Sequence, residues 1–189
     1  MDLAAQLRAF RPWNEQEERD REALLRLLEN GQAPYGREDP AHLTASAWVV
    51  SPGRDRVLLA YHNLYDSWSW LGGHADGERD LLSAALREVR EESGLEEVRP
   101  VSRDIYSVEI LTVDGHEKRG QYVSSPLHLN LTFLLEGDPG APVRRKADEN
   151  SAVAWFALEE AVAASTEPWF QTRIYSKLNA KLAGYPPVR

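Results

Sequence analysis

The stretch LGGHADGERDLLSAALREVREESGL, residues 71 to 95, joins a glycine-rich loop to a strongly acidic segment. Apolar residues recur in its second half at the i, i+3, i+4 and i+7 spacing of one helix face, at Leu82, Ala85, Leu86 and Val89. Gly94 is typical of the position that follows a helix end. The pattern therefore predicts a helix over residues 80–93.

Three glutamates, Glu88, Glu91 and Glu92, form a second stripe on this helix, rotated by roughly 120° from the apolar face. Like charges at these spacings repel, and near a helix C-terminus each costs roughly 0.3–1 kcal/mol. One interpretation is a surface helix in which Arg87 and Arg90 offset the repulsion. The other is a site for a hard divalent cation such as Mg²⁺, which prefers oxygen ligands. The preceding glycines favour the second interpretation, because they allow a ligand to approach the backbone.

Residues 73 to 95 resemble the signature of the Nudix hydrolases: a glycine, five residues, a glutamate, seven residues, then Arg-Glu-aliphatic-any-Glu-Glu-any-Gly-aliphatic. REVREESGL meets the second half in full, and Gly73 stands at the expected distance. Arg79 replaces the first glutamate, and Glu78 stands one residue early. In the family that glutamate pairs with the box arginine, here Arg87. The hypothesis is that Glu78 swings in to replace it, with activity retained, if weakened.

The resemblance implies hydrolysis of a diphosphate within a small nucleotide-like molecule, with Mg²⁺ or Mn²⁺ as the cofactor. Glu88, Glu91, Glu92 and the backbone at Gly73 would bind the metal, with Glu91 serving catalysis directly. Arg87 would orient the helix. Glu149, on a loop before a late strand, would act as a base or a further ligand, or else is a solvated loop carboxylate.

Two rival functions are compatible with the same fold. The first is a Nudix-fold sensor or regulator that binds such a compound without cleaving it. The loss of the first box glutamate supports the sensor, and the intact REVREE segment opposes it. The second is isomerase chemistry on a diphosphate-bearing substrate, which the absence of cysteine disfavours.

Five residues are candidates for substrate binding: Trp70, His74, Arg119, His128 and Asn130. Trp70 would stack a base or pack against a sheet. His128 and Asn130 share a strand face and would read a base or sugar, or would form a satisfied hydrogen-bonded pair. His74 and Arg119 lie in polar stretches and would contact phosphate. The basic run at residues 144–146 is predicted to be surface.

The remainder of the chain alternates strand-like and helical segments, which predicts an α/β sandwich with helices packed on a mixed sheet. Residues 1–40 are expected to form an N-terminal helical extension, and residues 41–189 the hydrolase domain, including a C-terminal helix. The extension would cap the domain, form a homodimer interface or cover the cleft. The polar segment at residues 114–121 is predicted to be a loop.

Composition restricts the partners of the 189-residue chain. Its net charge of −8 argues against binding a nucleic acid polymer, because affinity for phosphates rests on basic surface. The absence of cysteine excludes disulfides and thiolate metal sites. No apolar run reaches membrane length and the start lacks a signal sequence, so a cytoplasmic protein without a membrane partner is expected.

Overall fold

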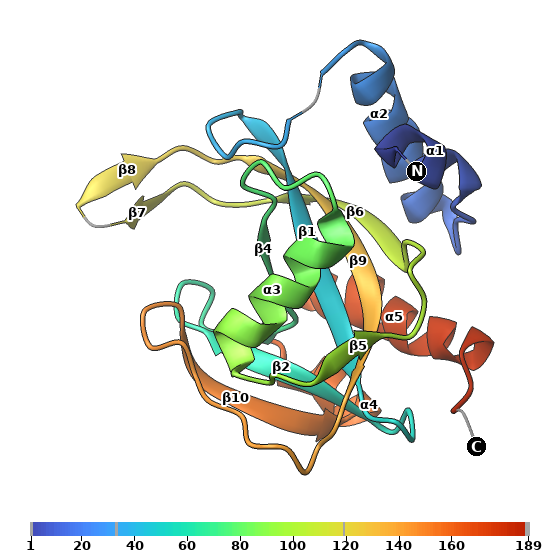
Figure 1. Ribbon diagram of the computed structural model, residues 1–189. Helices are drawn as coiled ribbons and strands as arrows, with labels where there is room; N and C mark the ends of the chain where they lie inside the picture. Colours follow the sequence, from blue (N-terminus) through green and yellow to red (C-terminus); the bar gives the residue numbers. More distant parts are fainter. Residues whose placement is uncertain (1, 33, 119, 188–189) are drawn as a thin grey trace.

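The computed structural model describes residues 2–32, 34–118 and 120–187. Its centre is a mixed β-sheet with helices on both faces, which confirms the predicted α/β sandwich (Figure 1). Two long parallel strands, β1 (Ala41–Val50) and β9 (Leu127–Gly137), run side by side in the middle of the sheet. The other strands of the sheet are added on either side of this pair.

The other strands extend the sheet on both sides of this pair. On the β1 side lie β2 (Arg56–His62), β3 (Ser67–Ser69), β4 (Leu71–His74) and β10 (Asn150–Ala157). On the β9 side lie β5 (Val98–Pro100) and β6 (Ser107–Thr112), both antiparallel to β9. Short β4 pairs antiparallel with the first half of β1, so the glycine-rich stretch is a strand rather than a free loop.

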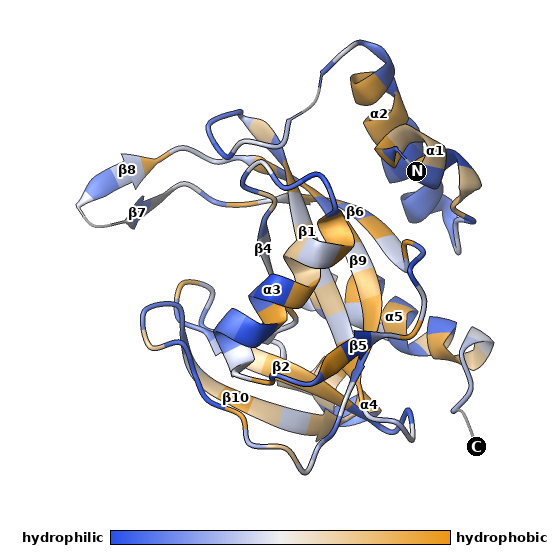
Figure 2. Cartoon of the chain, viewed as in Figure 1, coloured by the Kyte–Doolittle hydropathy of each residue, from blue (hydrophilic) through white to orange (hydrophobic). Residues whose placement is uncertain are grey.

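Helix α3 (Leu81–Ser93) crosses one face of the sheet, as Figure 1 shows. It begins after Asp80, whose carboxylate accepts a hydrogen bond from the Ser83 N–H at 3.3 Å, and it ends before Gly94 at φ +65°. Both ends agree with the prediction. Ala84, Ala85 and Val89 are fully buried against the sheet, whereas the last turns of the helix are hydrophilic (Figure 2).

Three C-terminal helical segments cover the opposite face: α4 (Leu158–Ala164), a π-helical turn (Phe170–Tyr175) and α5 (Ser176–Lys181), which a short 3-10 turn (Leu182–Gly184) follows. Because side chains alternate along a strand, even-numbered residues of β1 point to this face. Trp48 and Val50 lie in its apolar core. His42, Thr44 and Ser46 point the same way, so the first half of β1 presents a polar surface.

The N-terminal helix α2 (Glu15–Glu29) packs beside the edge strand β6, and α1 (Leu3–Ala9) packs on α2. Their apolar residues Leu7 and Leu24 belong to the same core as β1 and α3. Side chains of α2 also bond the open backbone of β6: Gln16 donates to the Val108 carbonyl, and Asp20 accepts from the Ile110 N–H. An unpaired strand edge invites pairing with other chains, and α2 covers this one. The structure thus shows the extension packed against the domain, as a capping role requires.

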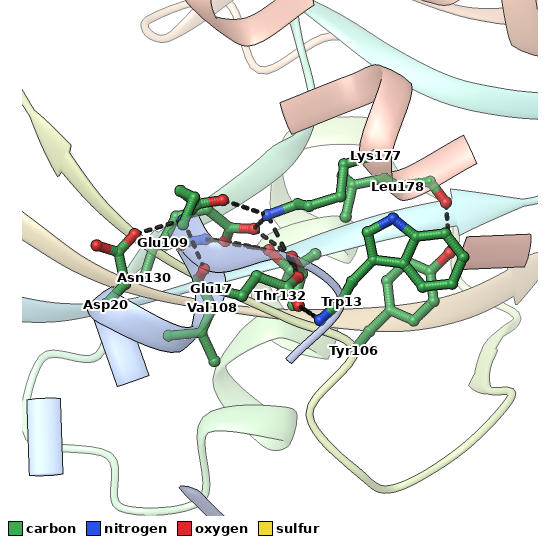
Figure 3. Close-up of polar contacts among 12 residues, drawn as sticks. Trp13, Glu17, Asp20, Tyr106, Val108, Glu109, Asn130, Thr132, Lys177 and Leu178 are labelled. Carbon is green, nitrogen blue, oxygen red and sulfur yellow. Dashed lines mark hydrogen bonds and ion pairs between the residues drawn. The ribbon is translucent and has the colours of Figure 1, made fainter. Parts of the chain in front are cut away.

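A buried ionic network fixes the extension to the domain (Figure 3). Glu17 accepts hydrogen bonds from Ser107 Oγ at 2.6 Å and Lys181 Nζ at 2.7 Å, and Lys177 Nζ lies 3.3 Å away. Lys177 also donates to Glu109 at 2.9 Å. Burial raises the pKa of Glu17, but the ammonium groups of Lys177 and Lys181 outweigh it and hold that pKa below its ordinary value. The ionised Glu17 therefore joins α2, β6 and α5.

Two elements differ from the prediction. The segment predicted to be a polar loop contains β7 (His116–Lys118) and β8 (Gln121–Val123), a hairpin that projects from the body (Figure 1). Its turn uses Gly120 at φ +74°, a conformation that glycine adopts without strain. Helix α4 begins after Ala157, which has no polar side chain to act as an N-cap, although Glu160 accepts a hydrogen bond from the Ala157 N–H at 3.3 Å. No helix in the described part of the chain combines the length and the apolar character needed to cross a bilayer.

Candidate active site

A cleft of about 910 Å³ opens between the C-terminal half of α3, strand β4, the polar half of β1 and the start of β9. Pockets of a few hundred to about 1,000 Å³ suit small-molecule ligands. Of the described residues that line the cleft, far more are acidic than basic. Residues of α1 and α2 are not among them, which argues against their covering the cleft.

The glycines of β4 bring the helix carboxylates against the backbone. The Gly72 N–H donates a hydrogen bond of 2.9 Å to Glu92. A Cβ at Gly73 would lie only 2.6 Å from the Glu88 carboxyl carbon, so only a glycine leaves room for that carboxylate. Glu88 and Glu92 are buried, and Glu91 is exposed at the cleft. The predicted metal-binding set of Glu88, Glu91, Glu92 and Gly73 is thus brought together.

Glu149 lies beside this set, on the loop before β10. Lys146 Nζ is 2.9 Å from the Glu149 carboxylate and 3.4 Å from the Glu91 carboxylate, so one cation links the loop to the helix. Asn150 strengthens the link by donating to the Glu92 backbone carbonyl at 3.0 Å. The sequence analysis did not identify Lys146 or Asn150 as site residues. Lys146 is half-buried rather than free on the surface, and nothing in its basic run distinguishes it from Arg144 and Arg145.

The electrostatics around Glu88, Glu91, Glu92 and Glu149 favour a bound cation. Burial raises the pKa of Glu92 to about 8, against the hydrogen bond from Gly72 and with added repulsion from Glu88 and Glu149. Burial also raises the pKa of Glu88, where Arg87 opposes the shift and Glu91 adds to it. Lys146 already shows that one positive charge fits between carboxylates of the helix and the loop. Clustered carboxylate oxygens are the donors that Mg²⁺ and Mn²⁺ prefer, so the residues fit such an ion.

This arrangement predicts how stability depends on pH. Since the folded-state pKa of Glu92 is raised from 4.5 to about 8, its stabilising contribution is complete below 4.5 and is lost as pH rises through 8. We therefore expect the melting temperature of chelator-treated protein to fall across this window. Added Mg²⁺ should raise it more at pH 8 than at pH 6, because the ion binds the ionised carboxylates. Thermal unfolding with EDTA or with Mg²⁺ measures both effects, and an equal Mg²⁺ effect at the two pH values would contradict them.

Arg87 is held by partners other than the one hypothesised. It donates to the His74 carbonyl at 3.2 Å and lies 3.1 Å from the Glu88 carboxylate. Glu78 instead accepts from the Asp80 N–H at 2.8 Å, and within the described residues it forms no ion pair with Arg87. The hypothesis that Glu78 replaces the missing box glutamate is therefore wrong for this structure. The backbone of β4 and Glu88 orient Arg87 instead.

Arg79 stands where the first box glutamate is expected, but its side chain packs against Tyr35 rather than against the glutamates of α3. Its guanidinium lies over the Tyr35 ring at 5.3 Å from the centroid, a cation–π contact. Beside this contact, Arg37 forms a two-pronged ion pair with Asp76 at the cleft rim.

Trp70 and Asn130 both line the cleft, but they differ in what they can offer a ligand. Trp70 is half-buried and packs edge-on against Phe170 at a centroid distance of 5.8 Å, so it forms part of an aromatic wall. The Asn130 amide is saturated: it accepts from Thr44 and Ser46 and donates to Glu109 and Thr132, at distances of 2.8–3.1 Å. This favours the satisfied hydrogen-bonded interpretation of Asn130, which shapes the cleft floor.

His74 and His128 meet on the face of the sheet opposite α3, together with His42. Burial, then the neighbouring His74 and His42, lowers the pKa of His128 to about 3, so its ring is neutral. His42, near the start of β1, was not among the candidates that the sequence analysis named. Arg119, the remaining substrate-binding candidate, lies outside the described residues.

Comparisons with known proteins agree with this fold. The family model described as the NUDIX domain matches residues 40–178. A Nudix hydrolase from M. Smegmatis, RenU, superposes with a TM-score of 0.54 at 18% identity, over 78% of this chain and 89% of that one. A C. elegans Ap4A hydrolase in a binary complex gives 0.52 at 21%, over 76% and 98%. An E. coli dihydroneopterin triphosphate pyrophosphohydrolase gives 0.51 at 17%, over 76% and 96%. No curated protein matches the chain.

Proposed function

The chain belongs to the Nudix family, and from this premise we propose that it is a Mg²⁺-dependent pyrophosphohydrolase acting on a small nucleotide-like diphosphate. The observation that carries the proposal is that Glu88 and Glu92 lie against the β4 backbone while Glu91 and Glu149, joined through Lys146, line the same cleft. A diphosphate is itself anionic, so it enters an acidic cleft only together with cations.

We assign the following roles to the chain's own residues. Glu88 and Glu92, fixed by β4, and Glu91, at the cleft surface, would hold the divalent ion. When bound, the ion supplies charge neutralisation at the diphosphate and lowers the pKa of the attacking water. Glu149 would accept a proton from that water, and the ion pair with Lys146 would hold its carboxylate in position. Trp70 offers an aromatic surface to the group joined to the diphosphate.

The names of two similar structures, an Ap4A hydrolase and a dihydroneopterin triphosphate pyrophosphohydrolase, concern those proteins. At their identities to this chain the likeness shows the fold and does not select a substrate. The compound in each of these two names nevertheless contains a phosphate anhydride chain, which supports a nucleotide-like diphosphate as the broad class of substrate. Both compounds therefore belong in the first substrate panel.

A ligand-binding regulator without hydrolase activity is the second candidate. The observation in its favour is Arg79, which replaces the box glutamate and turns to Tyr35. Against it stands Arg87, which is oriented without that glutamate. Both candidate functions predict that the chain binds such a compound, and only the hydrolase predicts that it cleaves the compound.

The deciding experiment incubates the full chain with nucleoside triphosphates, nucleotide sugars, ADP-ribose, dinucleoside polyphosphates and dihydroneopterin triphosphate, each with Mg²⁺, Mn²⁺ or EDTA. Products are resolved chromatographically. Metal-dependent release of two phosphorylated fragments, or of phosphate or pyrophosphate, from one class establishes the hydrolase. Tight binding of a compound by calorimetry, with no product from any compound, establishes the regulator and overturns the hydrolase.

A further inference from the structure

Three of the chain's five histidines form a compact triangle on the polar face of the sheet. The ring centroids of His42 and His74 are 4.9 Å apart, those of His42 and His128 5.1 Å, and those of His74 and His128 5.2 Å. One ring nitrogen from each residue lies within 4.8 Å of the other two. All three residues line the cleft.

His42 has one ring nitrogen that none of the described residues uses. The residue is 3% exposed, and its Nδ1 lies 2.8 Å from the Asp39 backbone carbonyl. A carbonyl only accepts, so Nδ1 carries the proton and Nε2 carries the lone pair. That Nε2 is buried and has no hydrogen-bond partner among the residues that the structure describes. A buried polar atom without a partner is uncommon, and an absent water or ion is a usual reason. Metal-binding histidines commonly donate their other N–H to a carbonyl in this way.

The fold builds the triangle from three strands and separates it from the glutamates. His42 and His128 stand directly opposite each other in the parallel β1–β9 pair, and His74 lies opposite Thr44 on β4. Successive residues of a strand face opposite ways, so Gly73 faces Glu88 while His74 faces the histidines. The cleft therefore presents oxygen donors on one side of β4 and nitrogen donors on the other.

We propose that His42, His74 and His128 form a second metal site, for a zinc-class divalent transition metal, with an open coordination position toward the cleft. Three imidazoles select Zn²⁺, Co²⁺ or related ions over Mg²⁺, and three protein ligands leave a position for water or substrate. A tetrahedral ion with bonds of ~2.1 Å holds its nitrogens ~3.4 Å apart, so binding draws the rings inward by roughly an ångström. The open position would take an oxygen atom of the ligand held in the cleft.

The test is a Co²⁺ titration of the chelator-stripped full chain in excess Mg²⁺, which keeps the carboxylate site filled with its preferred ion. Because the chain has no cysteine, visible d–d absorption reports nitrogen and oxygen ligands alone. We expect one strongly absorbing equivalent, and competition by Zn²⁺. Replacing His128, which is less buried than His42, with Gln should weaken Co²⁺ binding by at least ~10–100-fold.

Three further variants make the result decisive. His42→Gln should match His128→Gln, and the melting temperature of each metal-free variant shows that it folds. His62→Gln changes a histidine of the same cleft outside the triangle and should bind Co²⁺ like the wild type. Glu91→Gln should also keep the absorbing equivalent. Loss of that equivalent in Glu91→Gln but not in the histidine variants would place the ion at the carboxylates and overturn the proposal, as would no bound equivalent in the wild type.

Discussion

Replacing Glu92 with Gln is expected to lower kcat of the proposed hydrolysis on the order of 10²–10³-fold, the typical effect of removing one electrostatic group at a reaction centre. The same change should raise the melting temperature of the metal-free protein at pH 8. Activity is expected to fall while the melting temperature rises because of where Glu92 lies. The residue is 5% exposed, and burial raises the pKa of its carboxyl to about 8, so ionising it disfavours the fold while preparing it to bind a cation.

Glutamine keeps the shape of Glu92 and an oxygen that can accept the Gly72 N–H. It removes the charge, so the folded protein no longer includes an ionised carboxylate beside Glu88 and Glu149. The divalent ion then loses an anionic oxygen ligand. A gain in stability with a loss of activity is the signature of a destabilised functional site, whereas a merely structural residue would lose both.

The measurement compares kcat, Mg²⁺ affinity by calorimetry and the melting temperature in EDTA for Glu92→Gln and wild type. The matched control is Glu97→Gln, an exposed carboxylate shortly after α3, which should leave all three quantities unchanged. Should no substrate be found, Mg²⁺ affinity and melting temperature still test the assignment. Unchanged Mg²⁺ affinity, or a lower melting temperature together with lower activity, would remove Glu92 from the metal site.

The parts of the site that the sequence predicts are those encoded by short-range spacing. Helix α3 follows from its apolar stripe, Asp80 and Gly94, and the stripe of Glu88, Glu91 and Glu92 follows from the same periodicity. Strand β9 covers residues 127–137, and the first half of this stretch alternates apolar and polar residues as a strand does. Local spacing is sufficient to predict these elements, because the residues that define each one lie close together along the chain.

The missed parts depend on which distant strands become neighbours. His42 meets His128 only through the parallel register of β1 with β9, and no local pattern specifies that register. Lys146 differs from its basic neighbours only because Asn150 fixes the loop to the end of α3. The saturation of Asn130 likewise needs β1, β6 and β9 together. Sequence reasoning named Asn130 but left its partners open.

Replacing Glu17 with Gln is expected to destabilise the protein by about 3–5 kcal/mol, the usual cost of removing one partner from a buried ionic group. Glu17 is fully buried, and Lys181 and Lys177 both direct their ammonium groups at it. Lys177 keeps Glu109 as a partner in the variant, so the penalty falls mainly on Lys181. Burial already lowers the pKa of Lys181, and the Glu17 charge is what opposes that shift.

Urea unfolding of wild type and Glu17→Gln measures the difference, with Glu18→Gln, an exposed neighbour on α2, as a control expected to change stability by less than about 0.5 kcal/mol. The folded-state pKa of Glu17 is lowered from 4.5, so its contribution is present above 4.5 and is lost as pH falls through the folded-state value. The gap between wild type and variant should therefore be wide at pH 7 and narrow under acid. A gap that is small at pH 7, or independent of pH, would mean that the apolar contacts of α1 and α2 hold the extension and that the ionic network only sets its register.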